Sequence, residues 1–137
     1  MHHGKFGNLL NKKFWKGKNV LVTGHTGFKG TWLSQLLIEL GANVNGLSLP
    51  DSPSKPCLYD LLELDKTVVD LRGDITSSKT CNNAVNHSNP DILIHMAAQP
   101  LVKLSYQQPI LTYNTNIMGT VNILEAARNL DSIKAIL

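Results

Sequence analysis

Three glycines at a spacing of three residues form the part of the sequence best suited to chemistry. Gly24, Gly27 and Gly30 follow the apolar run 20–22 and precede an amphipathic segment. In a dinucleotide-binding strand–turn–helix unit, the first glycine forms the turn, the second lets the backbone approach the pyrophosphate, and the third lets the helix pack on the sheet. Glycine-rich turns also occur without a ligand, so the remaining elements must decide between a binding loop and a plain turn.

Strand and helix patterns alternate along the rest of the chain. Apolar runs predict strands at 20–22, 42–49, 68–71, 91–95 and 133–137. Helical spacing predicts helices at 28–40, 58–64 and 76–87, with Thr76 as a possible N-cap, and a long helix that ends near Leu130 and carries Ile117, Val121, Leu124 and Ala127 on one face. This alternation predicts an α/β fold, a doubly wound parallel sheet of the Rossmann type truncated after about five strands.

Several candidate binding residues follow the predicted strand ends. The glycine loop, the loop after Leu49, Asp74 and the segment 95–99 each come directly after a strand. Ligands of doubly wound sheets bind beyond the carboxyl ends of the strands, where the strand order reverses. The sequence therefore predicts one binding site at this edge.

Length and composition limit the class of protein. The 137 residues are enough for one domain, which we divide into a leader at 1–17 and a binding domain at 18–137. The net charge of +3 is mild and scattered, which argues against nucleic acid as a partner. The lysines at 5, 12, 13, 16 and 18 fit a solvated leader better than an anion-binding patch.

Targeting and metal signals are weak. No apolar run approaches the length of a membrane span or the core of a signal peptide, so a cytoplasmic protein without a membrane partner is expected. Cys57 and Cys81 lie in no metal-ligand spacing and are expected to be free thiols, and we predict no metal site.

With these residues in view, the chain resembles the N-terminal part of the sugar-nucleotide 4,6-dehydratases of the extended short-chain dehydrogenase/reductase family, in particular those that act on CDP-glucose. The resemblance is carried by residues 14–18, 23–30, 95–102, 105–106, 116–120 and 124–126. The glycine loop and the Asn-x-x-Gly-Thr segment that begins at Asn116 mark the superfamily. His25, Lys29 and the run 99–102 narrow the resemblance to the CDP-glucose enzymes.

The resemblance implies NAD as the cofactor. The residues that it assigns to cofactor binding are Gly24, His25, Thr26, Gly27, Phe28, Lys29, Gly30, Asp74, Ile75, Ala97, Ala98 and Gln99. Asp74 and Ile75 would contact the adenine, although Asp74 is also a common turn residue. Residues 97–99 would line the nicotinamide ribose. Asn116 would support the active-site floor, or be a satisfied amide of the core.

The implied activity converts CDP-glucose to CDP-4-keto-6-deoxyglucose by loss of water, with NAD regenerated in each cycle. The implied partners of a full-length protein are a CDP-sugar and a second copy in a homodimer or higher homo-oligomer. The implied setting is the synthesis of a surface polysaccharide.

Two departures from the family pattern leave alternatives open. The carboxylate that grips the adenosine ribose should close the second strand, yet Asp51 comes only after a proline, so His25 or Lys29 is a candidate for the ribose and the choice between NAD and NADP stays open. The catalytic Tyr-x-x-x-Lys does not occur and is expected after Leu137. A nucleotide-sugar epimerase or reductase, or a non-catalytic nucleotide-binding remnant, is therefore an alternative.

Overall fold

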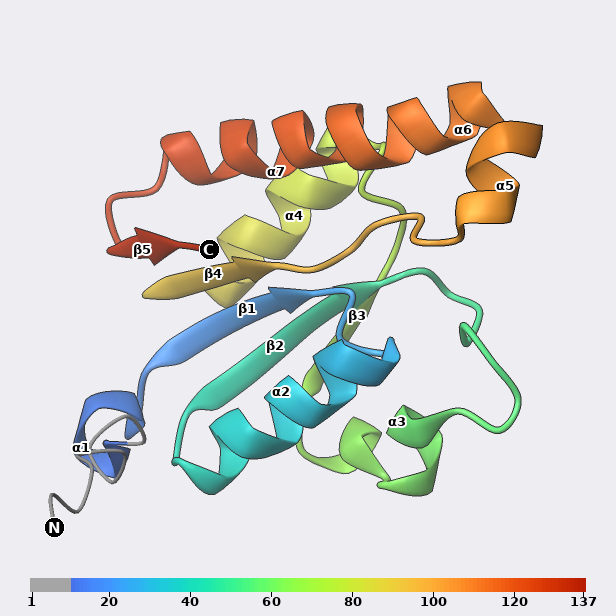
Figure 1. Ribbon diagram of the computed structural model, residues 1–137. Helices are drawn as coiled ribbons and strands as arrows, with labels where there is room; N and C mark the ends of the chain where they lie inside the picture. The colour runs from blue at the N-terminus through green and yellow to red at the C-terminus, as the bar shows by residue number, and fades with distance from the viewer. Residues whose placement is uncertain (1–10) are drawn as a thin grey trace, which may run out of the picture.

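The computed structural model describes residues 11–137, which form a parallel sheet covered by helices on both faces (Figure 1). The five strands lie in the order β3-β2-β1-β4-β5. Their bounds are β1 Asn19–Thr23, β2 Asn43–Ser48, β3 Val69–Arg72, β4 Ile92–His95 and β5 Ala135–Ile136. All four strand pairs are parallel, which confirms the predicted doubly wound α/β fold.

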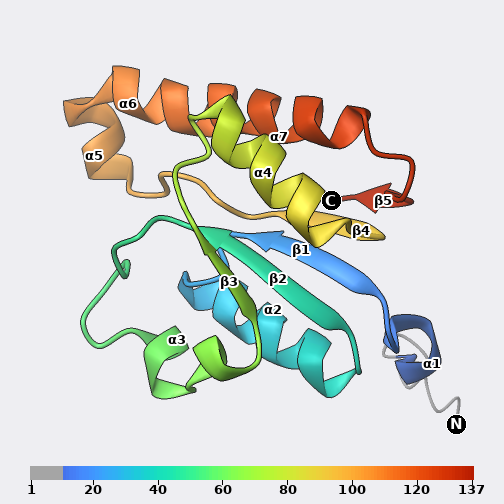
Figure 2. The same cartoon turned by 180° about the vertical axis from the view of Figure 1, so that it is seen from behind.

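The helices form two layers, which Figure 2 shows from behind. One face of the sheet carries α2 Phe28–Glu39, α3 Leu58–Leu61 and a 3₁₀ turn at Leu64–Lys66. The other face carries α4 Ser78–Ser88 and α7 Gly119–Arg128. The remaining helices are α1 Lys12–Trp15 before β1, α5 Val102–Gln107, α6 Pro109–Tyr113 and a π-helical turn at Asn114–Met118 that leads into α7.

Residues of the central strand point alternately into two cores. Val20 and Val22 pack in the cluster under α2 and α3, whereas Leu21 packs in the cluster under α4 and α7, and all three are fully buried. Successive side chains of a strand face opposite sides of a sheet. A strand buried on both sides therefore reads as a continuous apolar run, which is why this strand was predictable from sequence.

The apolar face that the sequence indicated on the long C-terminal helix is largely exposed. Ile117, Val121 and Leu124 are each about half exposed, and of the predicted face Ala127 alone is buried. The face that packs on α4 instead carries Ile123 together with the small residues Ala126 and Ala127. Both stripes are apolar, so helical spacing alone does not tell which one is covered.

Two further boundaries differ from the expectation. The N-cap of α4 is Ser77, whose Oγ accepts the Thr80 amide at 3.3 Å. The predicted cap, Thr76, instead donates its amide to Asp74 Oδ1 at 2.8 Å. The lysine at position 5 of the predicted leader lies outside the described residues, whereas residues 12–15 form α1.

Within residues 11–137, none of the helices combines the length and the apolar character needed to cross a membrane.

Gly30 tests the packing of α2 on the glycine loop. A Cβ at position 30 would lie 2.1 Å from the Gly24 carbonyl oxygen, so backbone would have to move. We expect Gly30→Ala to lower the free energy of unfolding in urea by about 1–3 kcal/mol. Lys29→Ala, at an exposed neighbouring position, is the matched control and should change stability by less than about 0.5 kcal/mol. Equal stability of the two variants would contradict this account.

Candidate functional site

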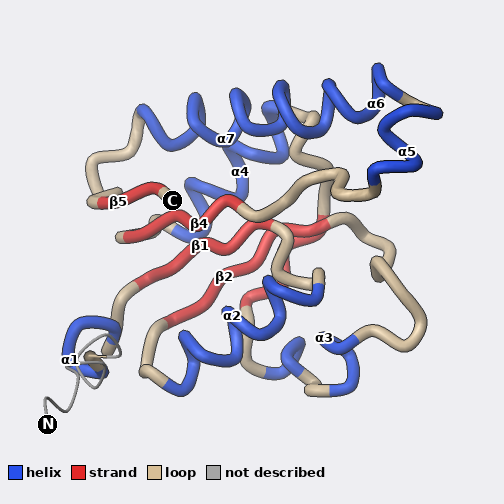
Figure 3. The backbone as a smooth tube through the Cα atoms, viewed as in Figure 1, coloured by secondary structure: helices blue, strands red, loops and turns tan. Residues whose placement is uncertain are grey.

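A cavity of about 420 Å³ opens at the carboxyl ends of the strands. Figure 3 shows the loops, in tan, that leave β1, β2 and β4 at this edge. The cavity is lined by residues that follow four strands and by part of the α5–α6 region: Gly24, Thr26, Ser48, Leu49, Asp51, Pro53, Gly73, Asp74, Ile75, Met96, Ala97, Ala98, Gln99, Pro100, Leu101, Leu104, Leu111 and Thr115. The strand order reverses between β1 and β4, so the cavity lies at the switch point where doubly wound sheets bind ligands.

Gly24 joins the loops that form the cavity floor. Its φ is +75°, and its amide donates to the Leu47 carbonyl at 2.7 Å. A Cβ at this position would lie 2.9 Å from the Ala97 amide nitrogen. Both the positive φ and the close approach require glycine, so the first glycine of the motif forms the turn as predicted.

The N-terminus of α2 has no capping side chain. Gly27 is the N-cap residue, the first turn contains no acidic residue, and the Thr31 amide makes the bond to the Gly27 carbonyl at 2.8 Å. By contrast, Ser77 caps α4 with its hydroxyl. The first backbone N–H groups of a helix lack partners within the helix, and together with the helix dipole they favour an anion. The fold therefore leaves the N-terminus of α2 without a capping side chain and without an acidic residue in its first turn.

The wall formed by Asp74 and Ile75 is held by α7. Asn122 donates its Nδ2 to the carbonyls of Ile75 at 2.9 Å and Thr76 at 3.0 Å. A Cβ at Gly119 would lie 2.5 Å from Ile75 Cδ1, so α7 approaches this wall closely. Asn122 was not among the residues singled out from the sequence. The feature that could have indicated it is a polar residue next to Ile123, which lies on the buried face of the helix.

The opposite wall, which begins at Ala97, is held by a network around His95. Thr23 Oγ1 accepts the amides of Met96 at 3.0 Å and Ala97 at 3.1 Å, and lies 2.7 Å from His95 Nδ1. The other ring nitrogen, Nε2, lies 3.1 Å from Thr120 Oγ1.

The hydrogen-bond partners of His95 determine which of its two ring nitrogens carries the proton. Thr120 Oγ1 uses its hydrogen on the Asn116 carbonyl at 2.7 Å, so it must accept from His95 Nε2. Thr23 then donates its hydroxyl hydrogen to an unprotonated Nδ1. Burial lowers the pKa of His95, which agrees with this neutral form. The network ties the end of β1 and the start of this wall to α7.

Asn116 forms a clamp on Gln99. Its Oδ1 accepts the Gln99 amide at 2.7 Å, and its Nδ2 donates to the Gln99 carbonyl at 3.1 Å. The Gln99 side chain also donates to Thr112 Oγ1 at 3.0 Å. Asn116 itself does not line the cavity. This geometry supports the interpretation of Asn116 as a satisfied amide, whose effect on the site passes through the position of Gln99.

Eleven of the twelve predicted cofactor-binding residues fall into two groups, and His25 stands apart. Seven of them line the cavity: Gly24, Thr26, Asp74, Ile75, Ala97, Ala98 and Gln99. Gly27, Phe28, Lys29 and Gly30 lie at the N-cap and in the first turn of α2, and none of the four lines the cavity. The Phe28 side chain is 72% exposed.

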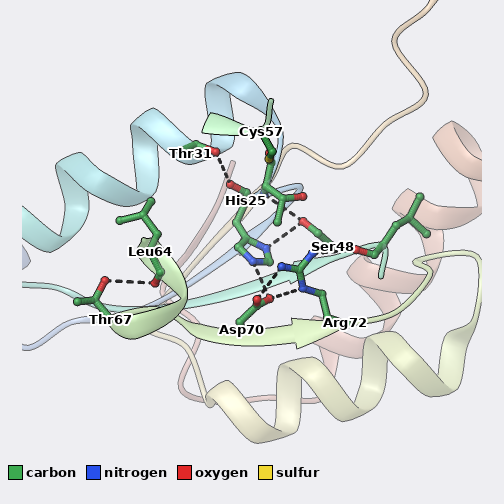
Figure 4. Close-up of polar contacts among 10 residues, drawn as sticks. His25, Thr31, Ser48, Cys57, Leu64, Thr67, Asp70 and Arg72 are labelled. Atoms are coloured by element: carbon green, nitrogen blue, oxygen red, sulfur yellow. Dashed lines mark hydrogen bonds and ion pairs between the residues drawn. The ribbon is translucent and has the colours of Figure 1, made fainter. Parts of the chain in front are cut away.

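The His25 side chain, one of the two candidates for contact with the ribose, does not line the cavity. His25 is fully buried, with Nδ1 2.9 Å from Ser48 Oγ and Nε2 3.0 Å from Asp70 Oδ1 (Figure 4). Both ring nitrogens are thus used inside the protein, because the loop folds over the imidazole. Sequence spacing placed His25 in the loop and did not show whether its side chain points toward or away from the cavity.

Asp51 lies on the cavity wall, although Pro50 separates it from the end of β2. It lines the cavity together with Ser48 and Thr26. The loop after β2 therefore places a carboxylate on the cavity wall, although β2 itself ends without an acidic residue.

Comparisons with known proteins place this site in a family. A model of the family described as GDP-mannose 4,6 dehydratase matches residues 21–137. The chain is 49% identical, over 93% of its length, to a CDP-glucose 4,6-dehydratase of Salmonella typhimurium, of which it covers 35%. It is 32% identical, over 91% of its length, to a GDP-mannose 4,6-dehydratase of Vibrio cholerae, of which it covers 34%. The chain thus spans about a third of the length of these two relatives.

Solved structures show the same fold. A UDP-glucose 4-epimerase from Thermus thermophilus in complex with NAD gives a TM-score of 0.71 at 30% identity, over 85% of this chain and 35% of that one. A UDP-glucose 4-epimerase from Thermotoga maritima with UDP-glucose gives 0.75 at 26% identity, over 86% and 36%.

The glycine loop, the parallel sheet and the cavity at its switch point agree with these matches, which confirm the resemblance seen in the sequence. The chain belongs to the GDP-mannose 4,6-dehydratase family.

Proposed function

We propose that this chain is the NAD-binding part of a nucleotide-sugar 4,6-dehydratase that acts on CDP-glucose. The observation that carries the proposal is a cavity at the switch point of the sheet, in front of an uncapped helix N-terminus. The 49% identity to a CDP-glucose 4,6-dehydratase supports the choice of substrate.

The residues present fit a dinucleotide. The α2 terminus would hold the pyrophosphate, Asp74 and Ile75 would border the adenine, and residues 97–99 would border the nicotinamide ribose. The bound cofactor would supply a hydride acceptor that is regenerated within the cycle. The chain's own contribution is to bind and orient this group, with its walls held by Asn122 and Asn116.

We propose that Asp51 favours NAD over NADP. A carboxylate at the adenosine end of a dinucleotide site accepts from the ribose 2′-hydroxyl and repels a 2′-phosphate. Asp51 lines the same cavity as Thr26, a residue of the glycine loop. Asp51 lies three residues beyond β2, and its carboxylate would take the role of the one that the family places at the strand end.

The dehydration itself requires more than the residues of this chain. The 137 residues contain no Tyr-x-x-x-Lys and cover 35% of the Salmonella dehydratase. We therefore propose that the groups that act on the sugar come from sequence outside these residues.

A nucleotide-sugar epimerase is the second candidate, because two UDP-glucose 4-epimerases share the fold at TM-scores of 0.71 and 0.75. Their identities of 26% and 30% are well below the 49% to the CDP-glucose dehydratase. This difference favours the dehydratase.

Phe28→Glu tests the phosphate site separately from stability. The side chain is 72% exposed in the first turn of α2, where a negative charge suits the helix dipole but repels a pyrophosphate. We expect unchanged or slightly raised stability and NAD affinity lowered at least about tenfold by isothermal titration calorimetry. Leu36→Glu adds the same charge farther along α2, at a residue that is 40% exposed, and should leave affinity unchanged. Equal affinities of the two variants would refute a pyrophosphate at this helix end.

Asp51→Asn tests the choice of cofactor. Removal of the carboxylate should raise the ratio of NADP affinity to NAD affinity about tenfold, because it removes the repulsion of the 2′-phosphate. Asp65→Asn makes the same charge change at an exposed residue that does not line the cavity and should leave the ratio unchanged. An unchanged ratio in Asp51→Asn would assign the selectivity to another residue.

A further inference from the structure

A polar cluster around the buried His25 lies beneath the glycine loop, with Asp70 and Arg72 at its partly exposed edge. It consists of His25 from the loop, Ser48 from β2, Tyr59 from α3, and Asp70 and Arg72 from β3; Figure 4 shows four of these side chains converging. His25 is fully buried, and the proposed function does not use its side chain in direct contact with the cofactor.

The carboxylate at the base of the cluster fixes the proton on His25. Asp70 is held by Arg72, whose Nε lies 2.7 Å from Oδ1 and whose Nη2 lies 2.7 Å from Oδ2. An ionised carboxylate only accepts hydrogen bonds, so His25 Nε2, 3.0 Å from Oδ1, must carry a proton. A neutral ring then has an unprotonated Nδ1.

That unprotonated nitrogen orients Ser48. The Ser48 hydroxyl donates to His25 Nδ1 at 2.9 Å, which leaves lone pairs on Oγ free to accept the Thr26 amide at 3.3 Å. The chain of bonds thus runs from Asp70 through His25 and Ser48 to the backbone of the glycine loop.

Packing holds the imidazole in this one orientation. A Cβ at Gly46 would lie 2.2 Å from the His25 ring, so the ring lies directly on the β2 backbone. The Tyr59 ring meets it edge-on with centroids 5.0 Å apart, and the Arg72 guanidinium lies 5.6 Å from the Tyr59 centroid.

We propose that His25 is a positioning residue for the dinucleotide: in the neutral form with its proton on Nε2, it orients Ser48 to accept the Thr26 amide and so holds the loop that places the α2 terminus against a pyrophosphate. This inference rests on the proposed function, because it takes a dinucleotide as the ligand of the loop.

Protonation of His25 reverses the bond to Ser48. The titratable or charged groups that face the ring and its loop are Asp70, Arg72, Tyr59 and Cys57, whose Sγ donates to the Thr26 carbonyl at 3.6 Å. Burial raises the pKa of Tyr59, so the phenol stays neutral.

Burial lowers the pKa of His25, against the opposing effect of Asp70, so the ring is neutral at pH 7. In more acidic solution Nδ1 becomes a donor, and the Ser48 hydrogen loses its acceptor.

The test is the NAD affinity of the chain, measured by isothermal titration calorimetry from about pH 8 down to about pH 5. Because burial holds the pKa of His25 below its ordinary value, wild-type affinity should be constant at neutral and alkaline pH and fall about tenfold only where the solution is acidic enough to protonate the ring. His25→Asn places a non-titrating amide oxygen near the position of Nδ1 and should bind nearly as tightly as wild type at the alkaline end, with a flatter pH profile. His25→Phe keeps a ring over Gly46 without an acceptor and should bind about tenfold more weakly throughout.

Nitrogen NMR of the imidazole provides a readout independent of the ligand. At pH 7 we expect His25 Nε2 protonated and Nδ1 unprotonated. A protonated Nδ1 at this pH would overturn the inference. If His25→Phe does not fold, the wild-type pH profile and His25→Asn decide.

Asp91→Asn is the matched structural control. Asp91 accepts the Asn19 amide at 2.9 Å and pairs with Lys18 at 3.5 Å, at the opposite end of the sheet from the cavity. Its loss should lower stability without changing NAD affinity. If the wild-type chain does not bind NAD at any pH, the proposed function fails and the inference fails with it. If it binds with a flat pH profile and His25→Phe binds equally tightly, only the role of His25 is refuted.

Discussion

Close backbone contact around Gly24 is the constraint on which the site depends. The Gly24 amide reaches the Leu47 carbonyl of β2, and its Cα leaves no room for a side chain beside Ala97. Its carbonyl accepts the Gly27 amide at 3.0 Å and lies where a Cβ of Gly30 would be. One residue thus brings together the ends of β1 and β2, the loop after β4 and the first turn of α2. A side chain at Gly24 or Gly30 would separate these parts and open the floor of the cavity.

Two histidines, the buried His25 and the partly buried His95, support opposite parts of this arrangement. His95 holds the wall that begins at Ala97 through Thr23, and His25 holds the glycine loop through Ser48. In each case the neighbours require a proton on Nε2 and an unprotonated Nδ1 that accepts from a hydroxyl. A hydroxyl whose hydrogen is used in this way keeps its lone pairs for backbone amides. Each histidine therefore orients backbone indirectly, and burial lowers the pKa of both.

The anion site and the walls differ in what fixes them. At the α2 terminus the backbone itself provides the donors, so glycine at the N-cap and the lack of an acidic first turn are enough. The walls instead depend on the distant segment 114–128, through Asn122 of α7 on residues 75–76 and through Asn116 of the π-helical turn on Gln99. The site is therefore complete only when the helix after β4 has packed on the sheet.

Residue types and their spacing were enough to predict the parallel sheet, the glycine loop and the position of the candidate site at the strand ends. Runs such as Val20 to Val22 are apolar because the strand is buried on both faces, and the glycine spacing reflects local backbone geometry. The direction of the His25 side chain, the place of Asp51 on the cavity wall and the buried face of α7 follow from the packing of the folded chain. These features depend on contacts between residues far apart in the chain, which local spacing does not encode.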